Sequence, residues 1–212
     1  MWKKEYKQKK FYWGLKPDLL LVKFLKFIPK GAVLDIGAGE GRNSIFLAEN
    51  NFRVEAIDKI AEGLIKCKNF AKQKNLSIKT KLCDIRKFDF KKNKHSLIIA
   101  VASLDFLKKS EIKKIIFKIK KSLQKEGIIY IVVFTTQDPV YKKLSETKKP
   151  IEINTFYSER LGCYRHFFAQ NELKKIFKEF EILHYQEYLK KDAHPDPHYH
   201  GLAEIIAKKG SL

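Results

Sequence analysis

The fold of this chain is decided by one stretch, Ala32-Val33-Leu34-Asp35-Ile36-Gly37-Ala38-Gly39-Glu40-Gly41-Arg42-Asn43-Ser44. Residues 32–36 form a short apolar run that predicts a buried strand. Three glycines follow it, and the pattern of residues 40–50 predicts a helix. Glycines permit positive φ and carry no Cβ, so a ligand can approach the backbone closely. Because open parallel sheets bind ligands beyond the carboxyl ends of their strands, this turn is the first candidate site.

Strands and helices alternate outward from this turn. Strands are predicted at 52–57, 76–82, 96–102, 128–134, 181–188 and 199–207, and helices at 16–27, 59–74, 110–125 and 169–180. Gly127 is expected to stop the helix over 110–125. Strands joined through helices imply a parallel sheet covered on both faces. We therefore predict an α/β fold: a doubly wound, mostly parallel, Rossmann-like sheet of seven strands with an antiparallel C-terminal strand.

Residues 135–168 interrupt this alternation. They mix proline, lysine and a cluster of aromatic residues between 156 and 168. An irregular stretch of this length inside a compact domain is usually functional. We expect a lid or substrate-binding insertion here, within a single domain spanning 1–212.

Composition limits the function classes. The chain has 212 residues, of which 44% are hydrophobic, which suits one core. It contains no apolar run of the roughly 18–20 residues that a membrane helix needs, and its N-terminus does not look like a signal peptide. The three cysteines are an odd number, spaced far apart, and are expected to be reduced thiols. We expect a soluble, cytoplasmic protein without a membrane partner.

The net charge of +20 raises the possibility of a nucleic-acid partner. However, lysines are spread over nearly every segment, and the arginines are only Arg42, Arg53, Arg86, Arg160 and Arg165. Proteins that bind bases and phosphates favour arginine, because its rigid, planar guanidinium can donate two hydrogen bonds at once. A nucleic-acid partner is therefore possible but not favoured.

The spacing of the glycines points away from a nicotinamide cofactor. Nicotinamide enzymes space their glycines G-x-G-x-x-G around a pyrophosphate, whereas this chain reads D-x-G-x-G-x-G. S-adenosylmethionine has no phosphate, and an acidic residue such as Asp35 suits its positive charge. The segment Asp35–Gly41 resembles the first motif of class I S-adenosylmethionine-dependent methyltransferases. Residues 34–58 are similar to the tellurite-resistance methyltransferase family in particular, and the resemblance covers roughly residues 31–134.

The resemblance implies a set of residues for S-adenosyl-L-methionine, whose product is S-adenosyl-L-homocysteine. In the class, a carboxylate at the position of Asp58 accepts the ribose hydroxyls. In the class, an acidic residue at the position of Asp84 contacts the adenine amino group, and the backbone amide at the position of Ile85 contacts the adenine ring. The full expected set is Asp35, Gly37, Ala38, Gly39, Gly41, Asn43, Asp58, Lys59, Asp84, Ile85 and Val101.

Three segments are candidates for the acceptor side. Tyr12-Trp13-Gly14 could fold over the cofactor or pack on the surface. Arg165 and His166 are candidate catalytic residues that could meet an anionic acceptor. The alternative for them is an aromatic mini-core under a lid, with solvated basic residues.

The third segment, 194–201, is rich in histidine. His194, His198 and His200 are candidate metal ligands, because imidazoles at close spacing can hold zinc or a similar ion. The alternatives are a polar turn at the mouth of the site and a plain loop, and no metal is the default expectation.

The function expected is methyl transfer to a small-molecule acceptor, possibly a thiol or a chalcogen oxyanion. RNA or protein methylation is the alternative, although 101–104 reads Val-Ala-Ser-Leu where a base-amine methyltransferase would carry an Asn/Asp-Pro-Pro-Tyr/Phe motif. A non-catalytic adenosyl-cofactor-binding module is the second alternative. The sequence leaves monomer and homodimer equally open.

Overall fold

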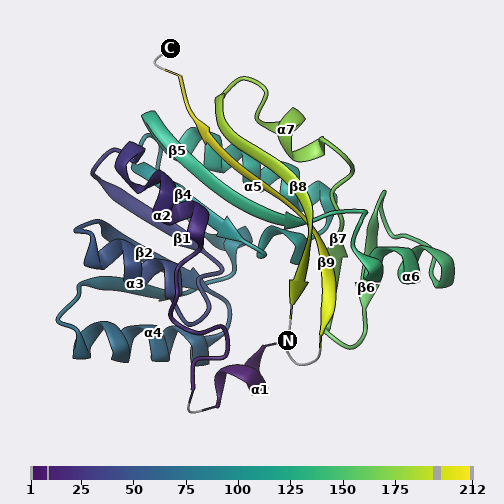
Figure 1. Cartoon of the computed structure of the whole chain (residues 1–212), viewed down its shortest axis with the longest axis horizontal. Coiled ribbons are helices and arrows are strands. Elements are labelled where there is room, and N and C mark those ends of the chain that lie inside the picture. Colours follow the sequence, from purple (N-terminus) through teal and green to yellow (C-terminus); the bar gives the residue numbers. More distant parts are fainter. Residues whose placement is uncertain (1, 9, 193–196, 211–212) are drawn as a thin grey trace.

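The computed structural model describes residues 2–8, 10–192 and 197–210. Its centre is a seven-stranded sheet in the order β3-β2-β1-β4-β5-β9-β8 (Figure 1). Strands β1 to β5 pair in parallel, and β9 runs antiparallel to both β5 and β8. This is the doubly wound sheet with one antiparallel C-terminal strand that the sequence predicts.

The elements follow the predicted order. The sheet strands are β1 Ala32–Ile36, β2 Arg53–Asp58, β3 Ile78–Leu82, β4 His95–Val101, β5 Leu123–Phe134, β8 Glu181–Asp192 and β9 His198–Lys208. The α-helices are α1 Lys3–Tyr6, α2 Leu19–Phe24, α3 Arg42–Glu49, α4 Ala61–Gln73, α5 Lys109–Ser122, α6 Pro139–Thr147 and α7 Glu172–Ile176. Short 3-10 turns lie at η1 Leu25–Phe27, η2 Ile85–Lys87 and η3 Leu104–Phe106, and a small hairpin consists of β6 Thr155–Ser158 and β7 Cys163–His166.

The central strands are buried on both faces. Leu97 and Ile99 of β4 pack on one side with residues of α2 and α3. Ile98 and Ala100 pack on the other side with residues of α5 and α7. Because successive strand side chains point to opposite faces, an uninterrupted apolar run such as 97–100 fits a strand covered by helices on both sides.

The predicted end of the helix over 110–125 is wrong. Helix α5 ends at Ser122, and Leu123 already pairs with His95 in the sheet. The Ser122 hydroxyl lies 2.7 Å from His95 Nδ1, and Leu123 is fully buried. Burial of Leu123 beside β4 therefore ends the helix before Gly127, which lies inside β5.

The predicted helix over 169–180 is shorter than expected. Asn171 has a left-handed backbone with φ of 57°, so α7 begins only at Glu172. Glu172 also accepts a hydrogen bond from the Ala169 amide at 2.9 Å, which closes the preceding turn. Leu173 and Phe177 are still fully buried, so the apolar pattern marks the packing correctly although not the helix length.

Residues 135–168 carry helix α6 and the β6–β7 hairpin, which lie beyond the end of β5 (Figure 1). Tyr141, Phe156 and Phe167 form an aromatic mini-core, with ring centroids 5.4 to 6.5 Å apart. Arg165 and His166 are buried rather than solvated. Among the helices of the described ranges, none has the length and apolar character needed to cross a lipid bilayer.

Candidate active site

The main pocket lies where β1, β2, β3 and β4 end. Its floor consists of residues 36–37, 57–60, 83–86 and 102–103, each of which follows or ends a parallel strand. The rest of its wall comes from Trp2 and Tyr6 of the N-terminal segment, from Phe106 and Leu107 after β4, and from the β6–β7 hairpin. This is the edge at which open α/β sheets bind ligands.

The glycine turn between β1 and α3 is closely packed. Gly37, Gly39 and Gly41 have φ values of 70°, 55° and 84°, a region that L side chains rarely adopt. A Cβ built on Gly37 would lie 2.5 Å from Ser103 Cβ, and one built on Gly41 would lie 2.3 Å from Cys67 Sγ. The turn therefore requires glycine both for its backbone conformation and for space.

Asp58, the last residue of β2, ties the glycine turn to the next strand. Its carboxylate accepts hydrogen bonds from the amides of Gly39 at 2.9 Å and Ile60 at 2.8 Å. Burial raises the pKa of Asp58, and the backbone hydrogen bonds oppose that shift. The side chain lines the pocket as a fixed acceptor.

Asp35 lies behind the turn. It is 4% exposed, does not line the pocket, and accepts a hydrogen bond of 2.6 Å from the Ser44 hydroxyl. Burial raises the pKa of Asp35 to about 6, although the Ser44 hydrogen bond lowers it. Asp35 therefore acts as a buried hydrogen-bond acceptor that ties the end of β1 to the first turn of α3.

Asp84 follows β3 and also lines the pocket. Its carboxylate accepts a hydrogen bond of 2.9 Å from the Arg86 amide and forms an ion pair with the Arg86 guanidinium. The Arg86 hydrogen bond holds the pKa of Asp84 below its ordinary value. Ile85 and Lys59 line the same pocket.

The segment after β4 supplies a buried polar atom to the site. Ser103 Oγ is buried and has no hydrogen-bond partner among the described residues. Ala102, before it, has a φ of 45°, which is unusual outside glycine. Strained backbone of this kind clusters at functional sites.

The N-terminal segment reaches the pocket differently from the expectation. Trp2 and Tyr6 line it, whereas Tyr12 and Trp13 do not. Glu40, which is 3% exposed, accepts hydrogen bonds from the amides of Tyr12 at 2.7 Å and Trp13 at 3.3 Å. Glu40 of the glycine turn therefore fastens the segment next to the site, a role that no local sequence signal reveals.

The β6–β7 hairpin contributes residues from both strands and from the turn between them. Tyr157, Cys163 and Tyr164 line the pocket, whereas Arg165 and His166 do not. The Arg165 guanidinium lies 4.8 Å from the ring centroids of both Phe134 and Phe167. Catalytic roles for Arg165 and His166 stay predictions.

The remaining predicted residues have other neighbours. Four of them do not line the pocket. Ala38, Gly39 and Gly41 belong to the glycine turn after β1, and Val101 is the last residue of β4. Asn43 accepts a hydrogen bond from the Asp18 amide at 3.0 Å and donates one of 2.9 Å to its carboxylate, so it anchors the segment before α2.

The histidine-rich segment is only partly described. His198 and His200 lie at the start of β9, outside the main pocket. His194 falls outside the described residues.

Comparison with known proteins extends the resemblance along most of the chain. Residues 2–198 match the family model for the tellurite resistance protein TehB, a longer match than the 31–134 expected from motifs. A protein of Haemophilus influenzae named a probable S-adenosyl-L-methionine-dependent methyltransferase TehB is 28% identical over 162 residues. That alignment covers 76% of this chain and 50% of the relative, so the chain spans about half the length of the curated relatives it matches.

Two solved structures share the fold. The crystal structure of TehB from Haemophilus influenzae has a TM-score of 0.75 at 24% identity, with 94% of this chain and 64% of that chain covered. A structure from Methanosarcina mazei, described as an S-adenosylmethionine-dependent methyltransferase, has a TM-score of 0.75 at 21% identity, with 93% and 100% covered. The fold and the match over residues 2–198 agree, and this chain belongs to the family of the tellurite resistance protein TehB.

Proposed function

We propose that this chain transfers the methyl group of S-adenosylmethionine to a small anionic acceptor, either a thiolate or a chalcogen oxyanion. The observation that carries the proposal is the pocket itself. Two strand-end carboxylates, Asp58 and Asp84, lie at its floor together with the turn at Gly37.

The pocket suits an adenosyl sulfonium on two further counts. Ser103 Oγ is a buried hydroxyl that has no partner in the described protein, beside a glycine whose Cβ would fill the space between them. Asp35 and Asp58 are buried carboxylates next to a turn that carries three glycines. Burial of a carboxylate is costly without compensation, so a cationic ligand nearby is favourable.

In this proposal, each group of residues has a defined part. Asp58 accepts the ribose hydroxyls, and Asp84 with the Ile85 amide holds the adenine. Bound S-adenosylmethionine supplies a methyl group on positively charged sulfur, and transfer leaves S-adenosylhomocysteine. The protein contributes chiefly by holding donor and acceptor in line, which can lower a two-body barrier by several kcal/mol.

The acceptor proposal rests on the residues opposite the donor side. Tyr157 and Tyr164 face the pocket, and Lys108 Nζ lies 4.6 Å from the Tyr164 ring centroid. Among the described residues that line the pocket, none is a histidine. A soft anion such as a thiolate needs no general base, whereas a hydroxyl or amine acceptor would need one. The three free cysteines suit a reducing, cytoplasmic setting, which we include in the proposal.

A screen for methyl transfer tests the proposal. The full chain is incubated with S-adenosylmethionine and, separately, with thiols, selenite, tellurite, bulk tRNA and a protein mixture, and S-adenosylhomocysteine is measured. We expect turnover with thiols or the oxyanions. Tyr164→Ala should raise the KM for the acceptor at unchanged donor affinity, and Phe117→Ala, at an exposed position on α5, should change neither.

Two outcomes would contradict the proposal. Methylation of only tRNA or protein would make the chain a macromolecular methyltransferase. Tight donor binding with no turnover on any acceptor would identify a non-catalytic binding module.

A further inference from the structure

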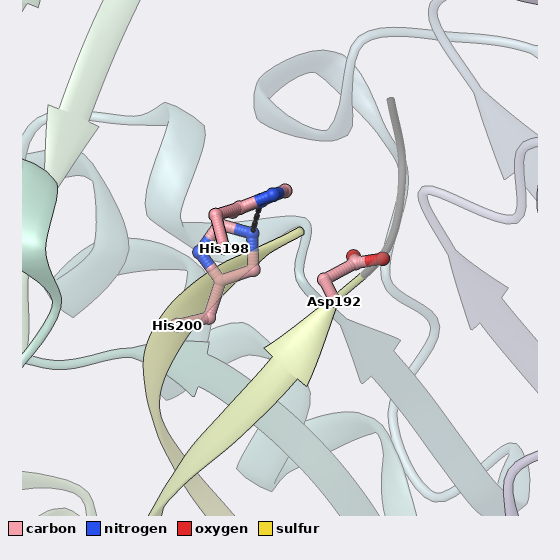
Figure 2. A group of neighbouring side chains, drawn as sticks. All are labelled: Asp192, His198 and His200. Carbon is pink, nitrogen blue, oxygen red and sulfur yellow. Dashed lines mark hydrogen bonds between the residues drawn. The ribbon is translucent and has the colours of Figure 1, made fainter. Parts of the chain in front are cut away.

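The β8–β9 hairpin brings three possible metal ligands together. Asp192 is the last residue of β8 and pairs with His198 of β9. His200 lies two residues after His198, so its side chain is on the same face of the strand. Figure 2 shows the three side chains on the two neighbouring strands, with the two imidazole rings nearly perpendicular, at an interplanar angle of 89°. One ligand atom from each residue lies within 4.8 Å of the others.

The two imidazoles meet through the same ring nitrogen. Nε2 of His198 lies 2.9 Å from Nε2 of His200. Two nitrogens bound to one tetrahedral zinc, each about 2 Å from it, lie roughly 3.3 Å apart. The pair is therefore within a few tenths of an ångström of a zinc-binding separation. The half-buried Asp192 offers a carboxylate oxygen within 4.8 Å of a ligand nitrogen of each imidazole.

Asp138 fixes which nitrogen of His200 is available. Its Oδ2 lies 2.9 Å from His200 Nδ1, and the Asp138 side chain is fully buried. Because a carboxylate only accepts hydrogen bonds, Nδ1 carries the proton and Nε2 of the neutral ring keeps its lone pair, which accepts the hydrogen bond from His198 Nε2. A bound ion would take the place of that proton, which the His198 ring would then carry on Nδ1. Metal-binding histidines almost always donate their second ring N–H to a carboxylate or a carbonyl in this way.

The chain holds Asp138 firmly in this position. Its Oδ1 accepts a hydrogen bond of 2.8 Å from the Val140 amide and caps helix α6. A Cβ on Gly201, the residue after His200, would lie 2.3 Å from the Asp138 amide nitrogen. The close approach of β9 to the start of α6 therefore depends on glycine at 201, and it places the carboxylate behind the histidine.

From this arrangement we infer that Asp192, His198 and His200 bind one divalent ion of the zinc class, with Asp138 as the group that orients His200. Two imidazoles and one carboxylate suit zinc and similar ions, whereas magnesium and calcium prefer all-oxygen sites. Three protein ligands leave at least one position of a tetrahedral ion open. The inference concerns a site outside the methyl-donor pocket and does not depend on the proposed methyl transfer.

Calorimetric titration of the untagged, chelator-treated full chain with ZnCl2 tests this site. We expect one zinc per chain with a Kd in the micromolar range or tighter, and no binding of MgCl2. His198→Ala, His200→Ala and Asp192→Asn should each weaken zinc binding by at least about 10-fold. His184→Ala is the matched control, because His184 lies on β8 and is paired with Glu204 at 3.0 Å, and it should leave zinc affinity unchanged.

The Asp138→Asn variant separates orientation from folding. Asparagine still caps α6, since Asn is among the best N-cap residues, but it lacks the carboxylate. Zinc affinity should fall by about 10- to 100-fold while the thermal unfolding midpoint of the metal-free protein changes little. Zinc stoichiometry near zero, or an unchanged affinity in the His198→Ala, His200→Ala double variant, would overturn the inference. The same variants should bind S-adenosylmethionine as wild type does, which would show that their loss of zinc binding does not come from damage to the donor site.

Discussion

At the scale of single residues, the site depends on carboxylates that the fold buries. Asp35 and Asp58 are both less than one-tenth exposed, and each is held by hydrogen bonds from the glycine turn or the helix after it. Such groups are acceptors in fixed positions. Their contributions to ligand binding and to stability can be measured separately.

Asp58→Asn should weaken binding of S-adenosylmethionine. The substitution removes a charged acceptor, and hydrogen bonds to charged groups contribute about 1.5–3 kcal/mol, which corresponds to a loss on the order of 10- to 100-fold. Calorimetric titration measures the affinity, and thermal unfolding checks the fold. Asp89→Asn is the control, because the Asp89 side chain is 68% exposed and pairs with the equally exposed Lys91. Equal affinities for Asp58→Asn and Asp89→Asn would exclude Asp58 from the donor site.

Asp35 should make stability depend on pH. An unfolded aspartate loses its proton near pH 4, whereas burial raises the pKa of folded Asp35 to about 6. Between these values the folded chain binds more protons than the unfolded chain. The contribution of Asp35 to the unfolding free energy therefore decreases as the pH rises. Relative to wild type, Asp35→Asn should gain up to about 3 kcal/mol between pH 4 and pH 6. Urea unfolding at several pH values measures this, and parallel pH profiles for the two proteins would refute the shift.

At the scale of elements, the turn between β1 and α3 is the part in which a glycine position leaves no space for a side chain. Gly37 and Gly14 offer a matched comparison, because their φ values are 70° and 69°. A Cβ on Gly37 would contact Ser103 at 2.5 Å, whereas one on Gly14 would meet nothing within 4 Å. The two positions share the backbone strain and differ in the space available.

Gly14→Ala should therefore lower the unfolding free energy by about 1–2 kcal/mol, the usual cost of a left-handed backbone for an L residue. Gly37→Ala should cost more, because the Ser103 segment must also shift, and it should lose most of its affinity for S-adenosylmethionine. Urea unfolding and calorimetry measure the two effects. If Gly37→Ala lost no more stability than Gly14→Ala and still bound S-adenosylmethionine, the glycine turn would tolerate a side chain.

Sequence predicts the elements of this chain better than their ends. Periodicity identifies the buried strands and the apolar faces of the helices, because burial determines both patterns. The end of α5 and the length of α7 are set instead by tertiary contacts of Leu123 and by the left-handed backbone of Asn171. The burial of Leu123 leaves no local sequence signal, and an asparagine favours a left-handed backbone without requiring it, so element boundaries are where the predictions fail.

At the scale of the whole molecule, sequence predicts the floor of the pocket but not its walls. Gly37, Asp58 and Asp84 come together because parallel strands end at one edge, which follows from the topology alone. Trp2, Tyr6 and the β6–β7 hairpin reach the same pocket from distant parts of the chain. Their approach depends on single long-range contacts, such as those of Glu40 with the amides of Tyr12 and Trp13, which no sequence periodicity encodes.

The most direct test of the account is a calorimetric titration of the folded full chain with S-adenosylmethionine, S-adenosylhomocysteine and NAD. We predict one binding site for each adenosyl ligand, with a Kd in the micromolar range, and no binding of NAD because the turn lacks the glycine spacing for a pyrophosphate. No detectable heat with either adenosyl ligand, in protein whose thermal unfolding is cooperative, would contradict the central claim.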